Sequence, residues 1–446
     1  MGIEVDWEFF LAQLPSGWRE LAVESGLIQP QPPQLNAKVT DIEPVLRLIL
    51  HRAGLEASLK MTTGEAAAAE LINLSSVALH KWERKLAPYL ASLSAQMSDA
   101  SQHFAPPRWS GYDVFVVDGS TVTRPASKGT TARLHYVLRL ATLDFVRSIV
   151  TDEHDGETLR LHEQVAAPDQ LWVADRVYAN PPGIGAIVSK GAAVLVRYNR
   201  GALPLYDIQG ERFDVLGHVR TVQTAGASDE WRVWVHPPQG APIRGRLCAV
   251  RLPDDKVEEA RERLRREYGQ HASAEGLEAA AWMMVFTTVP RSRMKVRRVL
   301  ELYRARWQVE LELKRDKSIG GLDMLPNFRD DTITTWLQAK LLLQHVAKKI
   351  TSQAKAVPPP PPDGTSERSP PSPRAPGRPL AQMVAGEAWR VMTLAYDAIR
   401  AALRFVPLHE IPARLRYFLA HIRRSNDQTR PKQIEIFQQE LRPAPG

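Results

Sequence analysis

The chain has 446 residues, 44% of them hydrophobic, and carries a formal net charge of +8 at pH 7. This length predicts two to four domains, and the excess of basic residues favours an anionic partner such as nucleic acid. A single cysteine, Cys248 in the apolar run LCAV, excludes an internal disulfide and a cysteine-based zinc site and indicates a buried thiol. Neither a basic segment followed by an apolar one at the start nor a stretch of about 18 apolar residues is present, so we expect a cytoplasmic protein with no membrane partner.

Residues 1–106 are predicted to form a helical N-terminal region that binds DNA. Within it, TTGEAAAAELINLSSVALHKWERKL predicts two helices with a break near Asn73–Ser76, where capping residues gather. This pair could be a helix-turn-helix or part of a plain helical bundle, and the sequence leaves both open. The first candidates for phosphate contacts are Arg19, His80, Lys81, Arg84 and Lys85.

Strand patterns begin after residue 107. We expect a strand at Val114–Val117 that ends in an Asp-Gly turn, then a hairpin formed by RLHYVLRLAT and FVRSIVTDE. A helix at Glu157–Val165, the strand LWVAD, a helix at Pro182–Ser189 and the strand AVLVRYN follow. Three meandering strands followed by strand, helix and strand is the order of an RNase H-like α/β core, whose first part we place at residues 107–200.

A β-rich insertion is predicted at residues 201–280. It contains the strand-type runs FDVLGHVRTVQ, EWRVWVH and GRLCAVRL and the charged helix KVEEARERLRREYG. The core resumes at residues 281–355 with the strand WMMVFTTVP and a helix from Lys295 to about Thr351.

Proline residues dominate residues 356–379, including Pro358–Pro362, and predict an extended linker. The helical C-terminal region, residues 380–446, contains MVAGEAWRVMTLAYDAIRAALRF, whose apolar face is large enough for partner docking and could serve in dimerisation.

The segment YRARWQVELELKRDK, residues 303–317, mixes acids, bases and rings. At about 100° per residue it separates into an apolar side and a polar stripe. The stripe contains Tyr303, Arg306, Glu310, Lys314 and Lys317, with Trp307 at its margin. Such a stripe is either a surface face with ion pairs, or a face on which Glu310 holds a cation while the bases hold a phosphodiester backbone. Two acids off the stripe, Glu312 and Asp316, are expected to serve solubility or local pairing.

Two further acids follow apolar strands, Asp118 in VVDGST and Asp175 in ADRVY. Acids at the ends of neighbouring strands meet at one edge of an α/β sheet. With Glu310 they would form a site for one or two divalent cations and for two-metal phosphoryl transfer. Two simpler interpretations stay open: an Asp118-Gly119 turn, and a structural ion pair between Asp175 and Arg176.

The spacing Tyr303-x2-Arg306-x3-Glu310-x6-Lys317, together with Asp118 and Asp175, resembles the Y-R-E-K signature and the catalytic acids of the cut-and-paste DDE transposases of bacterial insertion sequences. The resemblance covers roughly residues 107–345. It implies an RNase H-like core with an insertion before the glutamate, and a nucleoid-associated bacterial protein.

Carried over to this chain, the resemblance implies specific roles. The metal ligands would be Asp118, Asp175 and Glu310, holding Mg²⁺ as two ions that Mn²⁺ could replace. The contacts to phosphates would be Tyr303, Arg306 and Lys317, and Lys314 shares their stripe. Further DNA contacts would be Arg176, Arg197, Trp307, which would stack on a base, and Trp282, which would capture a flipped base or is equally well a core residue.

The function that these roles imply is that of a homodimeric transposase. It would bind the terminal inverted repeats of its element, cut double-stranded DNA there, through a hairpin if it follows the family, and join the 3′-OH ends to target DNA. The alternatives are an RNase H-like nuclease that cuts without joining, and a catalytically silent DNA-binding protein derived from a transposase.

Overall fold

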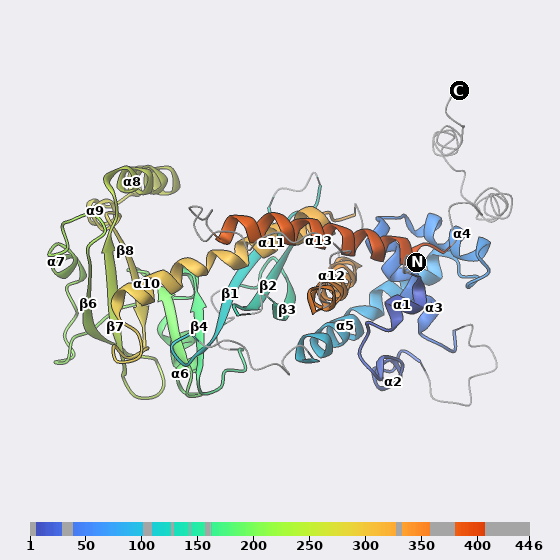
Figure 1. Ribbon diagram of the computed structural model, residues 1–446, viewed down its shortest axis with the longest axis horizontal. Coiled ribbons are helices and arrows are strands. Elements are labelled where there is room, and N and C mark those ends of the chain that lie inside the picture. Colours follow the sequence, from blue (N-terminus) through green and yellow to red (C-terminus); the bar gives the residue numbers. More distant parts are fainter. Residues whose placement is uncertain are drawn as a thin grey trace, which may run out of the picture.

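The computed structural model describes residues 6–28, 39–100, 109–125, 129–141, 144–156, 161, 163–326, 332–356 and 380–405. The molecule is elongated, with a β-sheet toward one end and the N-terminal helices at the other (Figure 1). The proline-rich linker at residues 357–379 and the last part of the predicted C-terminal region, residues 406–446, lie outside the described residues. So do residues 157–160 of the helix expected at Glu157–Val165, and the described residues of that segment, 161 and 163–165, are not helical.

One sheet of eight strands, in the order β3-β2-β1-β4-β5-β8-β7-β6, forms the centre of the fold. The first three strands are an antiparallel meander, and β4 and β5 continue it in parallel with β1, joined to each other by helix α6. This arrangement confirms the RNase H-like core. The bounds are β1 Asp113–Val122, β2 Ala132–Arg139, β3 Asp144–Asp152, β4 Gln170–Ala174, α6 Pro181–Val188 and β5 Ala193–Arg197.

The inserted residues extend the same sheet. Strand β8 (Trp282–Thr287) pairs antiparallel with β5, and the insertion's β7 (Ile243–Arg251) and β6 (Ser228–Val235) follow it outward. The insertion also supplies helices α8 (Asp254–Tyr268) and α9 (Ala274–Ala279).

The prediction of a strand in FDVLGHVRTVQ is wrong, because Val215–Val219 forms helix α7. The Asp214 carboxylate accepts the Gly217 N–H and starts the helix. Val215, Leu216 and Val219 are all buried, and their spacing places them on one face of a helix, whereas in a strand Leu216 would point away from the other two.

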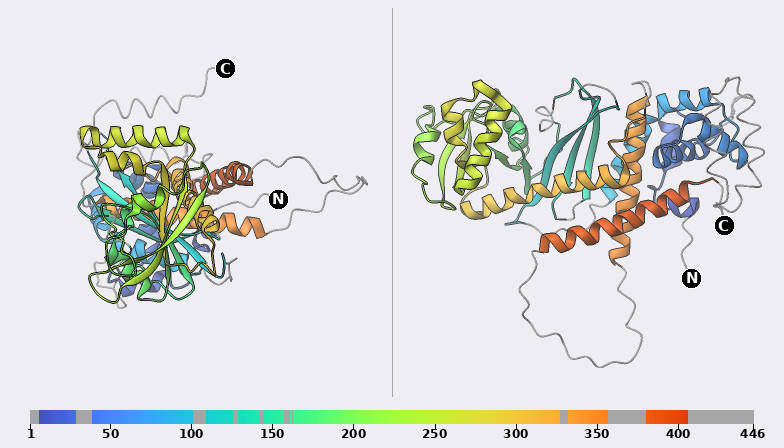
Figure 2. Two further views of the ribbon diagram at one scale, coloured as in Figure 1. Left: turned by 90° about the vertical axis from the view of Figure 1, so that its left-hand side faces the viewer. Right: turned by 90° about the horizontal axis from the view of Figure 1, so that it is seen from above.

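Helices cover both faces of the sheet because successive side chains of each strand point to opposite sides. On β1, Val114 and Val116 belong to the core formed with the later helices, whereas Phe115 and Val117 belong to the core formed with α6 and α7. The later helices run along the length of the molecule or across it (Figure 2). They are α10 Val296–Ala305, α11 Trp307–Gly320, α12 Ile333–Ala356 and α13 Leu380–Leu403.

Five helices form the described part of the N-terminal region: α1 Trp7–Leu11, α2 Trp18–Glu24, α3 Glu43–Leu55, α4 Leu59–Ala68 and α5 Ser76–Ala100. The break predicted between α4 and α5 is present, and the Ser75 hydroxyl accepts the Ala78 N–H at the start of α5. Of the candidate phosphate contacts, Lys81, Arg84 and Lys85 lie exposed on α5. Half-buried His80 lies 3.6 Å from Glu83, and Arg19 forms ion pairs with Asp41 and Glu43.

Helix α13 uses its apolar face within the chain. Met392, Tyr396, Ile399 and Leu403 are buried in the core that also contains residues of α3, α11 and α12. The face expected to dock a partner is therefore covered, and dimerisation through this region stays a prediction that needs another surface.

The expectation about Cys248 is met. Cys248 is fully buried in β7, and burial raises the pKa of its thiol to about 12, as a core thiol requires. Within the described residues, no helix is both long and apolar enough to cross a membrane.

Candidate active site

The sheet register brings Asp118 and Asp175 together. In the parallel pair of β1 and β4, Val117 lies opposite Ala174, and each acid is the next residue along the chain: Asp118 continues β1, and Asp175 directly follows the end of β4. Asp118 and Asp175 lie two residues after Val116 and its partner Val173, so their side chains point to the same face of the sheet as those valines, which face the core under α10 and α11. The two carboxylates therefore emerge on the face of the sheet that the signature segment covers.

Backbone N–H groups orient both carboxylates. The Asp118 Oδ1 accepts the Gly119 N–H at 2.9 Å, and the Asp175 Oδ1 accepts the Arg176 N–H at 2.7 Å. The Asp-Gly turn is wrong, because β1 continues through Gly119 to Val122 and Gly119 pairs with His135. The Asp175–Arg176 ion pair is also absent from these described residues: the Arg176 guanidinium lies 3.0 Å from Glu267 of α8 instead.

The signature segment is two helices, not the continuous helix expected from Lys295 to Thr351. The junction is Arg306, whose N–H bonds to the Tyr303 carbonyl and whose carbonyl accepts the Val309 N–H, both three residues apart. The Tyr303 hydroxyl donates to Asp175 Oδ1 at 3.3 Å. The junction thus places Tyr303 over the second acid and Arg306 beside the first.

Arg306 lies at the centre of the site. Its Nη1 is 3.3 Å from Asp118 Oδ2 and its Nη2 is 2.6 Å from Glu310 Oε1. Its side chain is 13% exposed, and that of Asp118 is 16% exposed. Acids from β1, β4 and α11 are therefore joined through Arg306 and Tyr303.

The electrostatics of the site favour a cation among these acids. The pKa of Asp118 is raised to about 6, because burial, with smaller contributions from Glu310 and Asp175, outweighs the lowering effects of Arg306 and the Gly119 N–H. Burial lowers the pKa of Arg306, but the neighbouring acids and Tyr303 outweigh it, so the net shift is upward and the guanidinium stays charged.

Carboxylate oxygens are the ligands that divalent cations of the Mg²⁺ type prefer, so this donor set fits such an ion. As the side chains stand, no three acids, histidines or cysteines among the described residues are close enough to hold a metal. Arg306 occupies the space between two of the acids instead.

The rest of the stripe is accessible. Trp307 is 52% exposed at the start of α11, Lys314 is exposed, and Lys317 Nζ donates to the Thr121 carbonyl of β1 at 3.2 Å. Glu312 and Asp316 do pair locally, but solubility is the wrong reason: Glu312 is 4% and Asp316 1% exposed. They pack in a buried polar cluster with Arg315 of α11 and with Gln344 and Lys348 of α12.

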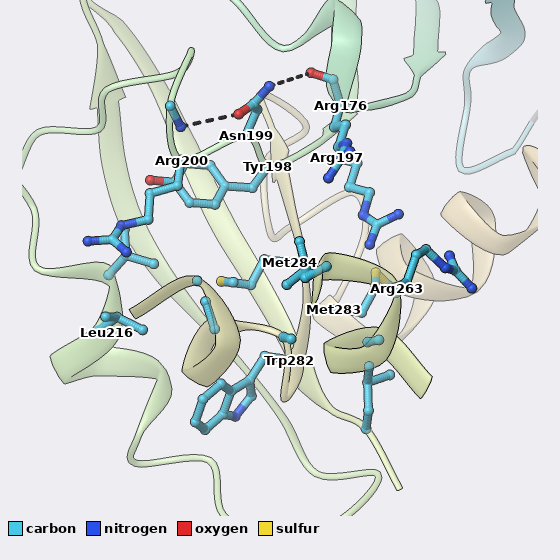
Figure 3. Close-up of a pocket in the computed structure, with 18 of the residues that line it drawn as sticks. Arg176, Arg197, Tyr198, Asn199, Arg200, Leu216, Arg263, Trp282, Met283 and Met284 are labelled. Carbon is cyan, nitrogen blue, oxygen red and sulfur yellow. Dashed lines mark hydrogen bonds between the residues drawn. The ribbon is translucent and has the colours of Figure 1, made fainter. Parts of the chain in front are cut away.

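A cavity of about 460 Å³ opens beside Asp175 (Figure 3). Three predicted DNA contacts line it, namely Arg176, Arg197 and Trp282. Trp282 is half-buried, and its indole N–H donates to the Val222 carbonyl at 2.8 Å.

Sequence reasoning missed other residues that line this cavity, among them Tyr198, Asn199, Arg200 and Arg263. Asn199 donates to the Arg176 carbonyl at 3.2 Å and accepts the Gly201 N–H, which fixes the loop after the second acid (Figure 3). The only sequence signal for Tyr198, Asn199 and Arg200 was their position directly after Arg197, and Arg263 in the charged helix α8 gave none. Glu267 gave no signal, because its place opposite Arg176 depends on how α8 folds back.

Comparison with known proteins decides the family. The profile described as "Transposase DDE domain" matches residues 109–343, more than half of the chain and all three acids. The chain belongs to the DDE transposases. It is 31% identical over 331 residues to the transposase for insertion sequence element IS421 of Escherichia coli, covering 72% of this chain and 88% of that one. A putative transposase, InsL, for insertion sequence element IS186A of Escherichia coli strain K12 is also 31% identical, over 330 residues with the same coverage.

The transposase is therefore an enzyme that cleaves and transfers DNA, and its family depends on divalent metal ions. Among solved structures, a piggyBac transposase synaptic complex with hairpin DNA aligns with 99% of this chain and 87% of that chain, at 9% sequence identity. Its TM-score of 0.38 is too low to carry any argument about this transposase.

Proposed function

We propose that the transposase acts as a homodimer that binds the terminal inverted repeats of an insertion sequence, cuts each end and joins the 3′-OH to target DNA. The observation that carries this proposal is the shared face of Asp118, Asp175 and Glu310, of which Asp118 and Glu310 contact Arg306 and Asp175 contacts Tyr303. A nuclease that cuts without joining needs the same acids, but it does not need the Y-R-E-K spacing of the signature segment.

Asp118, Asp175 and Glu310 are the proposed metal ligands. Two Mg²⁺ ions, replaceable by Mn²⁺, would lower the pKa of the attacking hydroxyl and neutralise charge on the leaving oxygen. The chain's own contribution is orientation: the Gly119 and Arg176 N–H groups and the Tyr303 hydroxyl each hold one carboxylate oxygen in place. Preset ligands reduce the reorganisation needed before reaction.

Tyr303, Arg306 and Lys317 are the proposed contacts to the phosphates next to the cut. A guanidinium can donate two parallel hydrogen bonds to a phosphate, and an ammonium acts as a point charge. Lys314, exposed one turn from Glu310, is an additional candidate. Trp307 is exposed enough to stack on a base at the DNA end.

The cavity beside Asp175 is the proposed site for a base flipped out of the duplex. Its floor is apolar, with Leu216, Met283 and Met284, and basic side chains including Arg176 and Arg197 stand around it (Figure 3). Such a lining suits a flat ring attached to a charged backbone. A flipped base at Trp282 would accompany closure of the DNA end into a hairpin.

The N-terminal region is the proposed reader of the terminal repeat, with the exposed bases of α5 as its phosphate contacts. This assignment rests on their exposure and charge alone. Residues 380–446 remain the proposed contributor to dimerisation.

The test uses full-length protein, Mg²⁺ and a duplex that contains one end of its own element with flanking DNA. The wild type should release the 3′ end at the element boundary and join it to a plasmid. Glu310→Gln should keep the fold and end binding but lose cleavage by at least about a thousandfold. Its matched control is Glu301→Gln, an exposed acid of α10 paired with Arg297 and Arg298. Cleavage by Glu310→Gln at the wild-type rate would refute the proposed site, and cleavage without joining would favour the nuclease.

A further inference from the structure

The Arg306 guanidinium cannot bridge two carboxylates and bind a DNA phosphate at the same time. The proposed function requires its guanidinium on a DNA phosphate, yet here the same group bridges Asp118 and Glu310, at 3.3 and 2.6 Å. Those carboxylates are the two that the proposed function assigns to the metal from β1 and α11. Arg306 therefore contacts the carboxylates that a metal ion would need, and the same guanidinium is needed for the DNA phosphate.

The guanidinium competes with a divalent cation for these oxygens. Each Asp118 or Glu310 oxygen that accepts a hydrogen bond from Arg306 has that lone pair directed at nitrogen rather than at a metal. Arg306 also cannot leave by losing its proton, since a guanidinium stays charged in proteins. A divalent ion that entered beside it would meet a fixed positive charge in a poorly solvated site.

A phosphate offers Arg306 an alternative partner close by. Tyr303 lies one turn before it, with the guanidinium 5.9 Å from the ring centre, and Lys317 Nζ contacts the Thr121 carbonyl, three residues beyond Asp118 on β1. A DNA phosphate held by Lys317 would thus lie at the mouth of the same site. Arg306 lies at the junction between α10 and α11, and its backbone N–H and carbonyl form i to i+3 hydrogen bonds with Tyr303 and Val309. Its side chain can change rotamer without breaking either helix.

We propose that Arg306 is an internal counter-ion that holds Asp118 and Glu310 in the DNA-free transposase and that a DNA phosphate draws it away, so that the acids take up divalent metal fully only on DNA. This inference rests on the proposed function, in which those acids are metal ligands. The order protects the cell's DNA, because a site without its metal does not cut. Since coupling between two ligands is reciprocal, metal must tighten DNA binding by the same factor as DNA tightens metal binding.

The experiment measures Mn²⁺ binding by the full-length protein without DNA, from the electron paramagnetic resonance signal of free Mn²⁺. Arg306→Gln should bind Mn²⁺ roughly tenfold more tightly than the wild type, because the competing cation is gone. Arg306→Lys, which keeps one charge but cannot fork two hydrogen bonds, should fall between them. Arg297→Gln removes one charge from an exposed position of α10, where Arg297 pairs with Glu301, and should leave Mn²⁺ affinity unchanged. Circular dichroism establishes that each variant is folded.

Adding the end-containing duplex provides the second measurement. In the wild type the duplex should raise Mn²⁺ affinity severalfold, and in Arg306→Gln it should raise it much less, since no counter-ion remains to be displaced. Equal or weaker Mn²⁺ binding by Arg306→Gln without DNA would overturn the inference, even if the wild type cuts as proposed. Loss of Mn²⁺ binding on Glu310→Gln is required in either case, and its absence would overturn the metal site itself.

Discussion

Replacing Asp316 by Asn should remove the contribution of one buried carboxyl group to the pH dependence of the transposase's stability. Asp316 is 1% exposed on α11, and Gln344 of α12 donates to its Oδ2. Burial raises its pKa from an ordinary value of 3.8 to about 7, with Lys348 and Arg315 lowering it and Glu312 raising it. The folded protein therefore keeps a proton on Asp316 that the unfolded chain has already released between about pH 4 and pH 7.

The magnitude follows from that difference. A raised carboxyl pKa contributes stability that is lost as pH rises through the window, so ionising Asp316 costs the folded state progressively up to about pH 7. From 3.8 to about 7, at about 1.4 kcal/mol for each pH unit, the full cost is about 4 kcal/mol. Asn carries no charge at any pH. The free energy of unfolding of Asp316→Asn relative to the wild type should therefore rise by about 4 kcal/mol between about pH 4 and pH 8.

The assay is urea unfolding at several pH values, followed by tryptophan fluorescence and circular dichroism, and a transition shared by both signals gives the free energy. The control is Asp397→Asn, since Asp397 is 60% exposed on α13 and pairs with Arg400 at 3.4 Å. Its difference from the wild type should stay within about 0.5 kcal/mol at every pH. If the difference in free energy of unfolding between Asp316→Asn and the wild type did not change with pH, Asp316 would ionise with its ordinary pKa. If the difference fell as pH rises, Lys348 would stabilise the carboxylate more than burial destabilises it.

His345→Leu should show the opposite pH dependence. Burial lowers the pKa of the His345 imidazole to about 4, so between about pH 6.5 and pH 4 the unfolded chain binds a proton at this residue that the folded protein does not bind. The variant should therefore lose less stability than the wild type on acidification, and an equal loss in the same urea titration would contradict this. Gly245→Ala should lower the free energy of unfolding by about 1–3 kcal/mol, since its Cβ would lie 2.3 Å from the Phe286 ring and 2.9 Å from the Thr287 carbonyl. Gly201→Ala, whose Cβ meets nothing nearer than 3.7 Å, is its control, and equal melting temperatures for the two would show that β7 and β8 can separate without cost.

Local patterns were enough to predict the core strands and the signature segment. Apolar runs of strand type predicted β2 to β5, and two acids after such runs, with the spacing of Tyr303, Arg306, Glu310 and Lys317, predicted the family, because these signals depend on residues close in the chain. The same local reasoning failed at FDVLGHVRTVQ, where the spacing of Val215 and Val219 fits both a strand and a helix and a capping aspartate decided for the helix.

Contacts between distant segments decided the rest. The pairing of Val117 with Ala174 places Asp118 and Asp175 on the same face, and a shift of β4 by one residue against β1 would leave the two acids on opposite faces of the sheet. From the sequence, Glu312 and Asp316 were expected to be surface acids, but in the structure α12 covers them. Their burial depends on this helix, which begins about 17 residues after Asp316. That Arg306 bridges Asp118 and Glu310 could not be read from spacing at all, because 188 residues separate it from Asp118 and only the packing of α11 on the sheet brings the charges together.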